Sequence, residues 1–257
     1  MGATVGHYSD GAARNPRLMG VTTFSAELTR QLRGDAGRPF VTFYDHATGE
    51  RVELSLTTYA NWVAKAAGLL VEEGDLERGM RLRLDLPTHW LGPVFLGAAW
   101  TIGLVVTDDD PDAVVCGPDT LATWAERAVD LPVFACSLRP LGVRFTESVP
   151  TGVHDVGLEV WTQPDAFTPW DVPSAADVAV EGDGVRLTQA ELMKAAAAGS
   201  VLTDGGRLFS ATNPASPPGI VTLTEPLTLG GSLVLVRHLA AEQSQSTYDA
   251  ERATHRF

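Results

Sequence analysis

Lysine and cysteine are scarce in this sequence, and no long apolar run is present. Lys65 and Lys194 are the only lysines among 19 basic residues, which are outnumbered by 32 acidic ones, so the net charge is −13. Binding to DNA or RNA without sequence preference depends on Lys and Arg neutralising phosphates, and anionic membranes attract basic segments for the same reason. No apolar run approaches the ~20 residues that span a bilayer. The composition therefore predicts no nucleic-acid partner and no membrane partner.

The two cysteines, Cys116 and Cys136, are too few for a disulfide framework and too far apart for a CxxC pair. Cys116 follows an apolar run at 113–115, which predicts a buried residue at the end of a strand. The first residues lack the apolar core of a secretory signal, so we expect 1–20 to form a flexible N-terminal tail. Together these features indicate a reducing, cytoplasmic location.

Apolar residues follow helical and strand periodicities in alternation along the chain. The expected elements in the first part are helices at 22–33, 57–73 and 87–102, and strands at 39–44, 50–54 and 80–86. Strands that alternate with helices are typical of a largely parallel sheet covered by helices. The sequence therefore predicts an α/β fold.

A polar, proline-rich stretch divides the chain. We interpret 162–175 as a connector between a first α/β lobe at 21–161 and a second at 176–240, which is followed by a polar, frayed C-terminal tail at 241–257. The second lobe repeats a layout of the first. In both, two strands around a tight turn precede a helix that begins after Leu-Thr, and a further strand follows a glycine.

Segment 54–106 resembles the N-terminal region of AMP-forming acyl-CoA synthetases, the adenylate-forming superfamily. The residues that match its pattern are mostly packing and turn residues: Leu56, Thr57, Tyr59, Ala67, Gly79, Leu86, Pro87, Trp90 and Gly103. Segment 187–236 resembles the part that follows the superfamily's phosphate loop, and the whole chain resembles short uncharacterised actinobacterial proteins related to these enzymes. The resemblance implies a truncated adenylate-forming N-terminal domain with mostly parallel sheets covered by helices.

The chain departs from the superfamily where ATP phosphates would bind. The hairpin expected at 178–187 has the tip Glu-Gly-Asp-Gly, without the Ser, Thr and Lys of a phosphate loop. Carboxylates there would repel phosphate oxygens, which need N–H groups, hydroxyls and a cation. The superfamily's aromatic-His element is replaced by 211–214, and its ribose-binding Asp and C-terminal lid would lie beyond Phe257. We therefore predict no catalytic residue and no cofactor, and no motif supports ATP or AMP.

Clustered carboxylates offer a weak candidate for a metal site. The acidic turn contains Asp108, Asp109, Asp110 and Asp112, and hard cations prefer such oxygens. The turn lacks the Gly and distal Glu of a Ca²⁺ loop, so we expect a solvated turn and no metal. Thr222 to Glu225 imitates a Mg²⁺-binding signature of the superfamily, but we expect an ordinary helix turn.

Histidines give little support for a site. His89 lies at a helix start beside Trp90, where we expect a boundary residue with its hydrogen bonds satisfied. The others are scattered, and none lies four residues from a cysteine or from another histidine, as in common helical zinc sites; they include His46, His154, His238 and His255.

The leading functional hypothesis is a non-catalytic relative of the synthetases that binds a small molecule, a nucleotide or an acyl group, in a residual cleft between the lobes. The alternative is a structural or interaction protein that acts through a homodimer or a partner interface. A third hypothesis is an enzyme of altered mechanism, for which the acidic turn is the only visible group.

Overall fold

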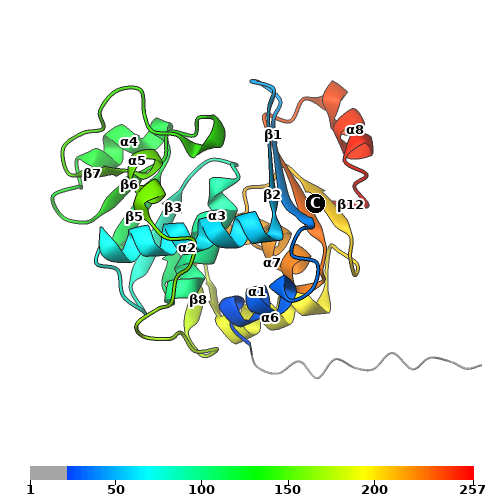
Figure 1. The fold of residues 1–257 in the computed structure, drawn as a ribbon, viewed down its shortest axis with the longest axis horizontal. Helices are drawn as coiled ribbons and strands as arrows, with labels where there is room; N and C mark the ends of the chain where they lie inside the picture. The colour runs from blue at the N-terminus through cyan, green and yellow to red at the C-terminus, as the bar shows by residue number, and fades with distance from the viewer. Residues whose placement is uncertain (1–21) are drawn as a thin grey trace, which may run out of the picture.

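The computed structural model describes residues 22–257, and the expected tail at 1–20 lies outside the described residues. Two sheets lie next to each other with helices between and around them (Figure 1). One has five strands in the order β12-β10-β11-β1-β2, and the other has seven in the order β7-β6-β5-β3-β4-β8-β9. This confirms the α/β class and the mostly parallel sheets.

The five-stranded sheet combines both ends of the described chain. Its strands are β1 (Pro39–Asp45), β2 (Glu50–Ser55), β10 (Arg207–Ser210), β11 (Ser232–Arg237) and β12 (His255–Arg256). β1 pairs in parallel with β11, and β10 pairs in parallel with β11 and β12. The one antiparallel pair is the β1–β2 hairpin, which the sequence predicted.

The seven-stranded sheet is parallel except for its last hairpin. Its strands are β3 (Arg81–Asp85), β4 (Val105–Thr107), β5 (Ala113–Cys116), β6 (Val133–Ala135), β7 (Val153–Asp155), β8 (Val178–Gly182) and β9 (Val185–Thr188). β8 and β9 are antiparallel and form the predicted hairpin. Cys116 is buried at the end of β5, as expected.

The described helices are α1 (Phe24–Leu32), α2 (Leu56–Glu72), α3 (Leu91–Ile102), α4 (Pro118–Ala125), α5 (Val156–Glu159), α6 (Gln189–Ala198), α7 (Val221–Thr228) and α8 (Ala241–Ala250), with short 3₁₀ turns η1 (Pro140–Gly142), η2 (Val160–Thr162) and η3 (Pro217–Gly219). Four of the eight described helices, α1, α2, α5 and α6, begin after a residue whose side chain caps the first turn. The Ser55 hydroxyl accepts the Thr58 N–H at the start of α2, and Thr188 and Glu191 form a capping box on α6. Such caps satisfy N–H groups that have no partner within the helix.

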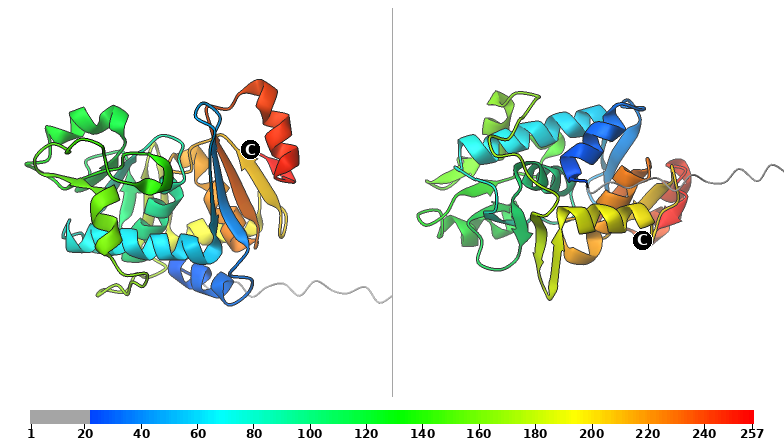
Figure 2. Two further views of the ribbon diagram at one scale, coloured as in Figure 1. Left: turned by 45° about the horizontal axis from the view of Figure 1, so that its top comes forward. Right: turned by 90° about the horizontal axis from the view of Figure 1, so that it is seen from below.

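One apolar core joins the two sheets through α2 and α3. α2 runs from the seven-stranded sheet to β1 and β2 and packs on α3 (Figures 1 and 2). The helices approach closely at Gly97, where a Cβ would lie 2.7 Å from the Tyr59 hydroxyl oxygen. Trp100 of α3 is buried and donates its indole N–H to the Ala179 carbonyl at 2.9 Å. The interior between the sheets is therefore filled by side chains.

Sheet pairing crosses the lobe boundaries that the sequence suggested. The β1–β2 hairpin, from the expected first lobe at 21–161, pairs with strands from the end of the chain, and β8–β9, from the expected second lobe at 176–240, extends the sheet of the first. The expectation of a frayed tail at 241–257 is wrong, because α8 covers the outer face of the five-stranded sheet (Figure 1) and β12 pairs with β10. No helix among residues 22–257 has the length and apolar character needed to cross a bilayer.

Gln189 ties three helices together and should be sensitive to substitution. It is buried at the start of α6, where its side-chain oxygen accepts the Phe24 N–H at 2.9 Å and its side-chain N–H donates to the Trp100 carbonyl at 2.9 Å. Gln189→Ala leaves both groups buried without partners, so we expect the free energy of unfolding to fall by about 2 kcal/mol. Urea denaturation measures this change. The exposed Gln243 of α8 provides a matched control, and an equal effect of Gln243→Ala would contradict the argument.

Candidate functional site

The carboxyl ends of strands from both sheets meet along one edge. Asn213, in the loop after β10, donates its side-chain N–H to the Leu86 carbonyl after β3 at 2.7 Å. The Thr88 hydroxyl donates to the Ala211 carbonyl across the same junction at 3.4 Å. Open α/β sheets bind ligands beyond the carboxyl ends of their strands. This junction is therefore a candidate ligand-binding site.

Five titratable or charged residues gather at this junction, and we call them the edge cluster: Asp45, Glu50, His89, Arg237 and His238. Asp45 ends β1 and faces Arg237 in the parallel register with β11 and Glu50 in the antiparallel register with β2. The His238 ring nitrogen Nδ1 lies 2.8 Å from Asp45 Oδ1. The strand pairing itself thus brings these groups together.

His89 is the most buried member of the edge cluster, with 1% of its surface exposed. Its ring packs edge-on against Phe43 at 4.8 Å between centroids. The Leu91 N–H donates to Nδ1 at 3.3 Å, which places the ring proton on Nε2, and Nε2 has no hydrogen-bond partner. Burial, with help from the Arg237 charge, lowers the pKa of His89 to about 3. The expectation of a satisfied boundary residue is therefore wrong: His89 is a neutral, buried donor with one unpaired N–H.

The acidic and basic members complete a mixed site. Burial acts to raise the pKa of Asp45, but hydrogen bonds from His238 and from the Ala47 N–H outweigh it and lower that pKa. Burial and then the Asp45 charge raise the pKa of Glu50, whose Oε1 is buried without a partner. Arg237 forms no ion pair within 4.0 Å among residues 22–257. A buried N–H donor beside an unpaired cation can hold a small anion such as a carboxylate.

The pKa of His89 makes stability depend on pH in a definite direction. An unfolded histidine titrates near ~6.5, so below that pH the unfolded chain binds a proton that the folded chain accepts only near pH 3. The stability that neutral His89 contributes is thus present above pH ~6.5 and is lost as the pH falls, by up to about 1.4 kcal/mol per pH unit. Urea unfolding at several pH values between 7 and 4 should show a shallower slope for His89→Asn than for the natural protein. Equal slopes would contradict the assignment.

The four aspartates of the acidic turn do not converge on a metal position. Asp112 accepts the Arg81 N–H at 2.7 Å, and the side chains of Arg81 and Arg83 donate to the backbone carbonyls of Asp109 and Asp108. Asp110 has a left-handed backbone, with φ of 39°. Within 22–257, the potential metal ligands that approach one another within 4.8 Å in a group of three are Glu73, His154 and Glu159. The turn, including Asp108, Asp109, Asp110 and Asp112, instead lies over β3 and is held by arginines.

Glu225 supports a loop through both of its carboxylate oxygens. It is 1% exposed in α7, and it accepts hydrogen bonds from the Ser200 N–H and hydroxyl and from the N–H groups of Val201 and Leu202 at 2.6–3.0 Å. Both oxygens are therefore occupied by protein donors, and the resemblance to a Mg²⁺-binding signature has no counterpart in the geometry. The sequence carried no sign of this role, because the partners lie more than 20 residues away.

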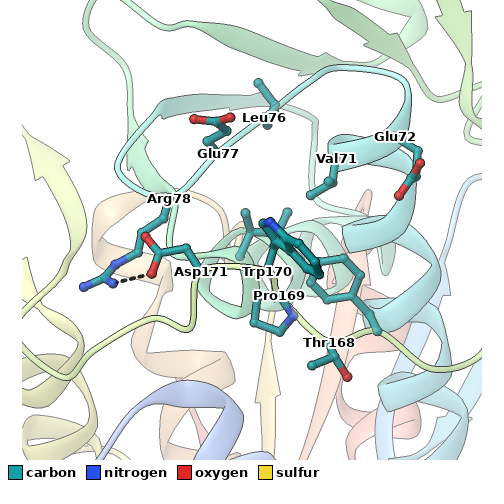
Figure 3. Close-up of a pocket in the computed structure, with 11 residues that line it drawn as sticks. Val71, Glu72, Leu76, Glu77, Arg78, Thr168, Pro169, Trp170 and Asp171 are labelled. Carbon is teal, nitrogen blue, oxygen red and sulfur yellow. Dashed lines mark hydrogen bonds and ion pairs between the residues drawn. The ribbon is translucent and has the colours of Figure 1, made fainter.

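A hollow of about 530 Å³ lies at the opposite edge of the seven-stranded sheet (Figure 3). Its walls come from the end of α2, the loop before β3 and the expected connector; they are Val71, Glu72, Leu76, Glu77, Arg78, Ile102, Phe167, Thr168, Pro169, Trp170 and Asp171. Arg78 pairs with Asp171 of the connector at 2.9 Å and with Asp177, just after the connector, at 2.7 Å. Trp170 is fully exposed. No motif in the sequence indicated this hollow, because its walls are distant along the chain.

Comparisons with known proteins place the fold. No family model matches the chain. A protein of Mycobacterium tuberculosis named "TIGR03089 family protein" is 35% identical over 241 residues, which cover 91% of this chain and 97% of that protein. An acyl-CoA synthetase of Brucella canis has a TM-score of 0.77 at 18% identity, and coronafacic acid ligase of Pectobacterium brasiliense has 0.70 at 13%.

The two solved structures are longer than this chain. The alignments cover 91% and 90% of this chain but only 47% and 49% of those proteins, so the chain spans about half their length. The resemblance to the N-terminal region of acyl-CoA synthetases is thereby confirmed for the fold.

Proposed function

This chain belongs to the TIGR03089 family, and from that premise we propose that it is a non-catalytic relative of acyl-CoA synthetases that binds a small carboxylate-bearing molecule at the edge cluster. The observation that carries the proposal is the unpaired Nε2–H of His89 beside the unpaired Arg237. A carboxylate accepts hydrogen bonds from both kinds of donor, and bonds that involve a charged group are about twice as strong as neutral ones. Glu50, whose pKa is raised, can add a donor when protonated.

The electrostatics of the β8–β9 hairpin support binding without activation of the acid. Attack of a carboxylate on the α-phosphate of ATP needs donors and cations around the phosphates. The hairpin tip offers Glu181 and Asp183 instead, and Glu181 lies 3.7 Å from both Arg81 and Arg186. The solved relatives are named as a synthetase and an acid ligase. In this proposal the protein binds the carboxylic acid but does not transfer it to the α-phosphate of ATP.

Calorimetric titration tests the proposal with three probes: decanoate, a non-hydrolysable acyl-adenylate mimic and Mg-ATP. We expect saturable heat with decanoate or with the mimic, and no pyrophosphate release in the presence of Mg-ATP and decanoate. Arg237→Gln should weaken binding at least about 10-fold, because it removes a charged donor. The control is Arg186→Gln, which changes an exposed arginine on the hairpin. Absence of heat with all three probes, or equal affinity in Arg237→Gln, would remove the proposal.

An interaction protein is the second candidate, and one observation favours it. Five large apolar side chains are exposed within a single stretch of the chain: Leu141, Leu158, Trp161, Trp170 and Val172. Large exposed apolar side chains that adjoin in space are typical of protein interfaces, and we infer such a surface from the closeness of these five along the chain. If this stretch joins two copies, sedimentation equilibrium should show a mass that rises with concentration and a return to monomer in Trp170→Glu. A monomer at all concentrations would argue against self-association.

A further inference from the structure

Three ligand-type side chains from distant parts of the chain meet beside the seven-stranded sheet. They are Glu73, which caps the C-terminus of α2, His154 of β7 and Glu159 of α5. One ligand atom from each lies within 4.8 Å of the other two, and His154 Nδ1 is 2.9 Å from Glu159 Oε2. β7 is an edge strand of the sheet, and α5 follows it directly (Figure 1). No local motif indicates this group, because Glu73 is about 80 residues from His154 in the sequence.

A single buried aromatic ring fixes two of the three positions. Phe134 of β6 is fully buried and stacks on the His154 ring, with centroids 4.9 Å apart and planes 21° apart. Gly74, which follows Glu73, packs so tightly on the same ring that a Cβ there would lie 2.8 Å from Phe134 Cζ. The side chain of Asp155 accepts the Gly157 N–H at 3.0 Å and so sets the start of α5. The backbone at all three ligand positions is therefore held before any ion binds, as metal sites require.

We propose that Glu73, His154 and Glu159 bind one divalent transition-metal ion of the zinc type. An imidazole nitrogen and two carboxylates are ligands of Zn²⁺ and its neighbours, whereas Ca²⁺ and Mg²⁺ prefer oxygen ligands alone. The two carboxylates balance the charge of the ion, and the negative end of the α2 dipole also favours a cation there. The His154 and Glu159 side chains are 26% and 27% exposed, so solvent reaches the site. Three protein ligands leave a coordination position for water.

Titration calorimetry of the tag-free, EDTA-treated full chain tests this proposal, with ZnCl₂ as the probe and MgCl₂ as the comparison. We expect one equivalent of Zn²⁺ to bind saturably and Mg²⁺ to give no comparable heat. Co²⁺ should give visible absorption bands whose intensity reports its coordination number. Cys116 and Cys136 are buried and should not take part.

Substitutions distinguish specific Zn²⁺ binding at these three residues from adventitious Zn²⁺ binding elsewhere on the surface. His154→Ala and Glu73→Gln should each weaken Zn²⁺ binding more than about 10-fold, and Phe134→Leu should weaken it about 10-fold or more by releasing His154. Glu73 is exposed at a helix end, so Glu73→Gln should fold normally, which thermal unfolding verifies. The matched controls are His255→Ala and Glu77→Gln, which should bind as the natural protein does. No saturable Zn²⁺ heat, or undiminished binding in both Glu73→Gln and His154→Ala, would overturn the proposal.

Discussion

Gly219→Ala should lower the free energy of unfolding by more than about 3 kcal/mol, or prevent folding altogether. Gly219 lies in η3, where a Cβ would stand 1.8 Å from the carbonyl oxygen of Asn213 and 3.0 Å from the Ser216 hydroxyl. The first of these atoms belongs to the backbone, so no rotamer change relieves the clash. Two hydrogen bonds keep the loop from moving away. The Asn213 side-chain N–H donates to the Leu86 carbonyl at 2.7 Å, and the Gly219 N–H donates to the Ser216 carbonyl at 2.9 Å.

Urea denaturation followed by fluorescence and circular dichroism measures this loss. Gly37→Ala is the matched control, because the nearest atom to a Cβ at Gly37 is 3.7 Å away and belongs to the Asp35 side chain. We expect the control to change stability by less than about 0.5 kcal/mol. A Gly219→Ala protein within 1 kcal/mol of the natural one, on the order of a surface substitution, would show that the junction between β10 and β3 yields more readily than its contacts indicate. If the variant does fold, it should also bind the edge-cluster probes more weakly.

Glu225→Ala should cost about 3 to 5 kcal/mol of stability, since it leaves four donors without an acceptor, among them the N–H groups of half-buried Val201 and buried Leu202. The affected donors belong to residues 200–202, which connect α6 to β10. Glu225→Gln should lower the stability nearly as much, because the glutamine side chain replaces one acceptor oxygen by an NH₂ group, which would face the donors of residues 200–202. Ser200→Ala removes one of the four bonds, and we expect it to cost about 1 kcal/mol.

Chemical denaturation of the three variants gives the comparison, with Glu242→Ala of α8 as an exposed control. The expected order of stability loss is Glu225→Ala, then Glu225→Gln, then Ser200→Ala, with the control near zero. If Glu225→Ala is no worse than Ser200→Ala, the carboxylate does not hold the loop. The change should leave Zn²⁺ binding at Glu73, His154 and Glu159 unaltered in any fraction that folds, because the two sites share no residue.

Local patterns sufficed for most helices and for both hairpins. The apolar spacing at 57–73 predicted α2 to within a residue, and local side chains set the helix starts: Ser55 caps α2, and Thr188 and Glu191 form the capping box of α6. The surroundings of the site residues could not be predicted from local patterns. His89 was expected to be satisfied, but its surroundings are set by Phe43 and Arg237, which reach it only through the packing of one sheet on the other. Neither periodicity nor spacing carries information about such a neighbour.

The sequence by itself determined the order and type of most elements before α8, because these depend on side chains two to four residues apart; α8 and β12 were not predicted. It also determined the negative charge at the tip of the β8–β9 hairpin, because Glu181 and Asp183 lie together in the local sequence Glu-Gly-Asp. Only the tertiary structure decided which strand pairs with which. In each repeated unit the hairpin joins one sheet and the strand after the helix joins the other: β1–β2 is separated from β3, and β8–β9 from β10. That exchange depends on hydrogen bonds and apolar contacts between residues far apart in sequence, and it is what brings Asp45 and Arg237 to one edge.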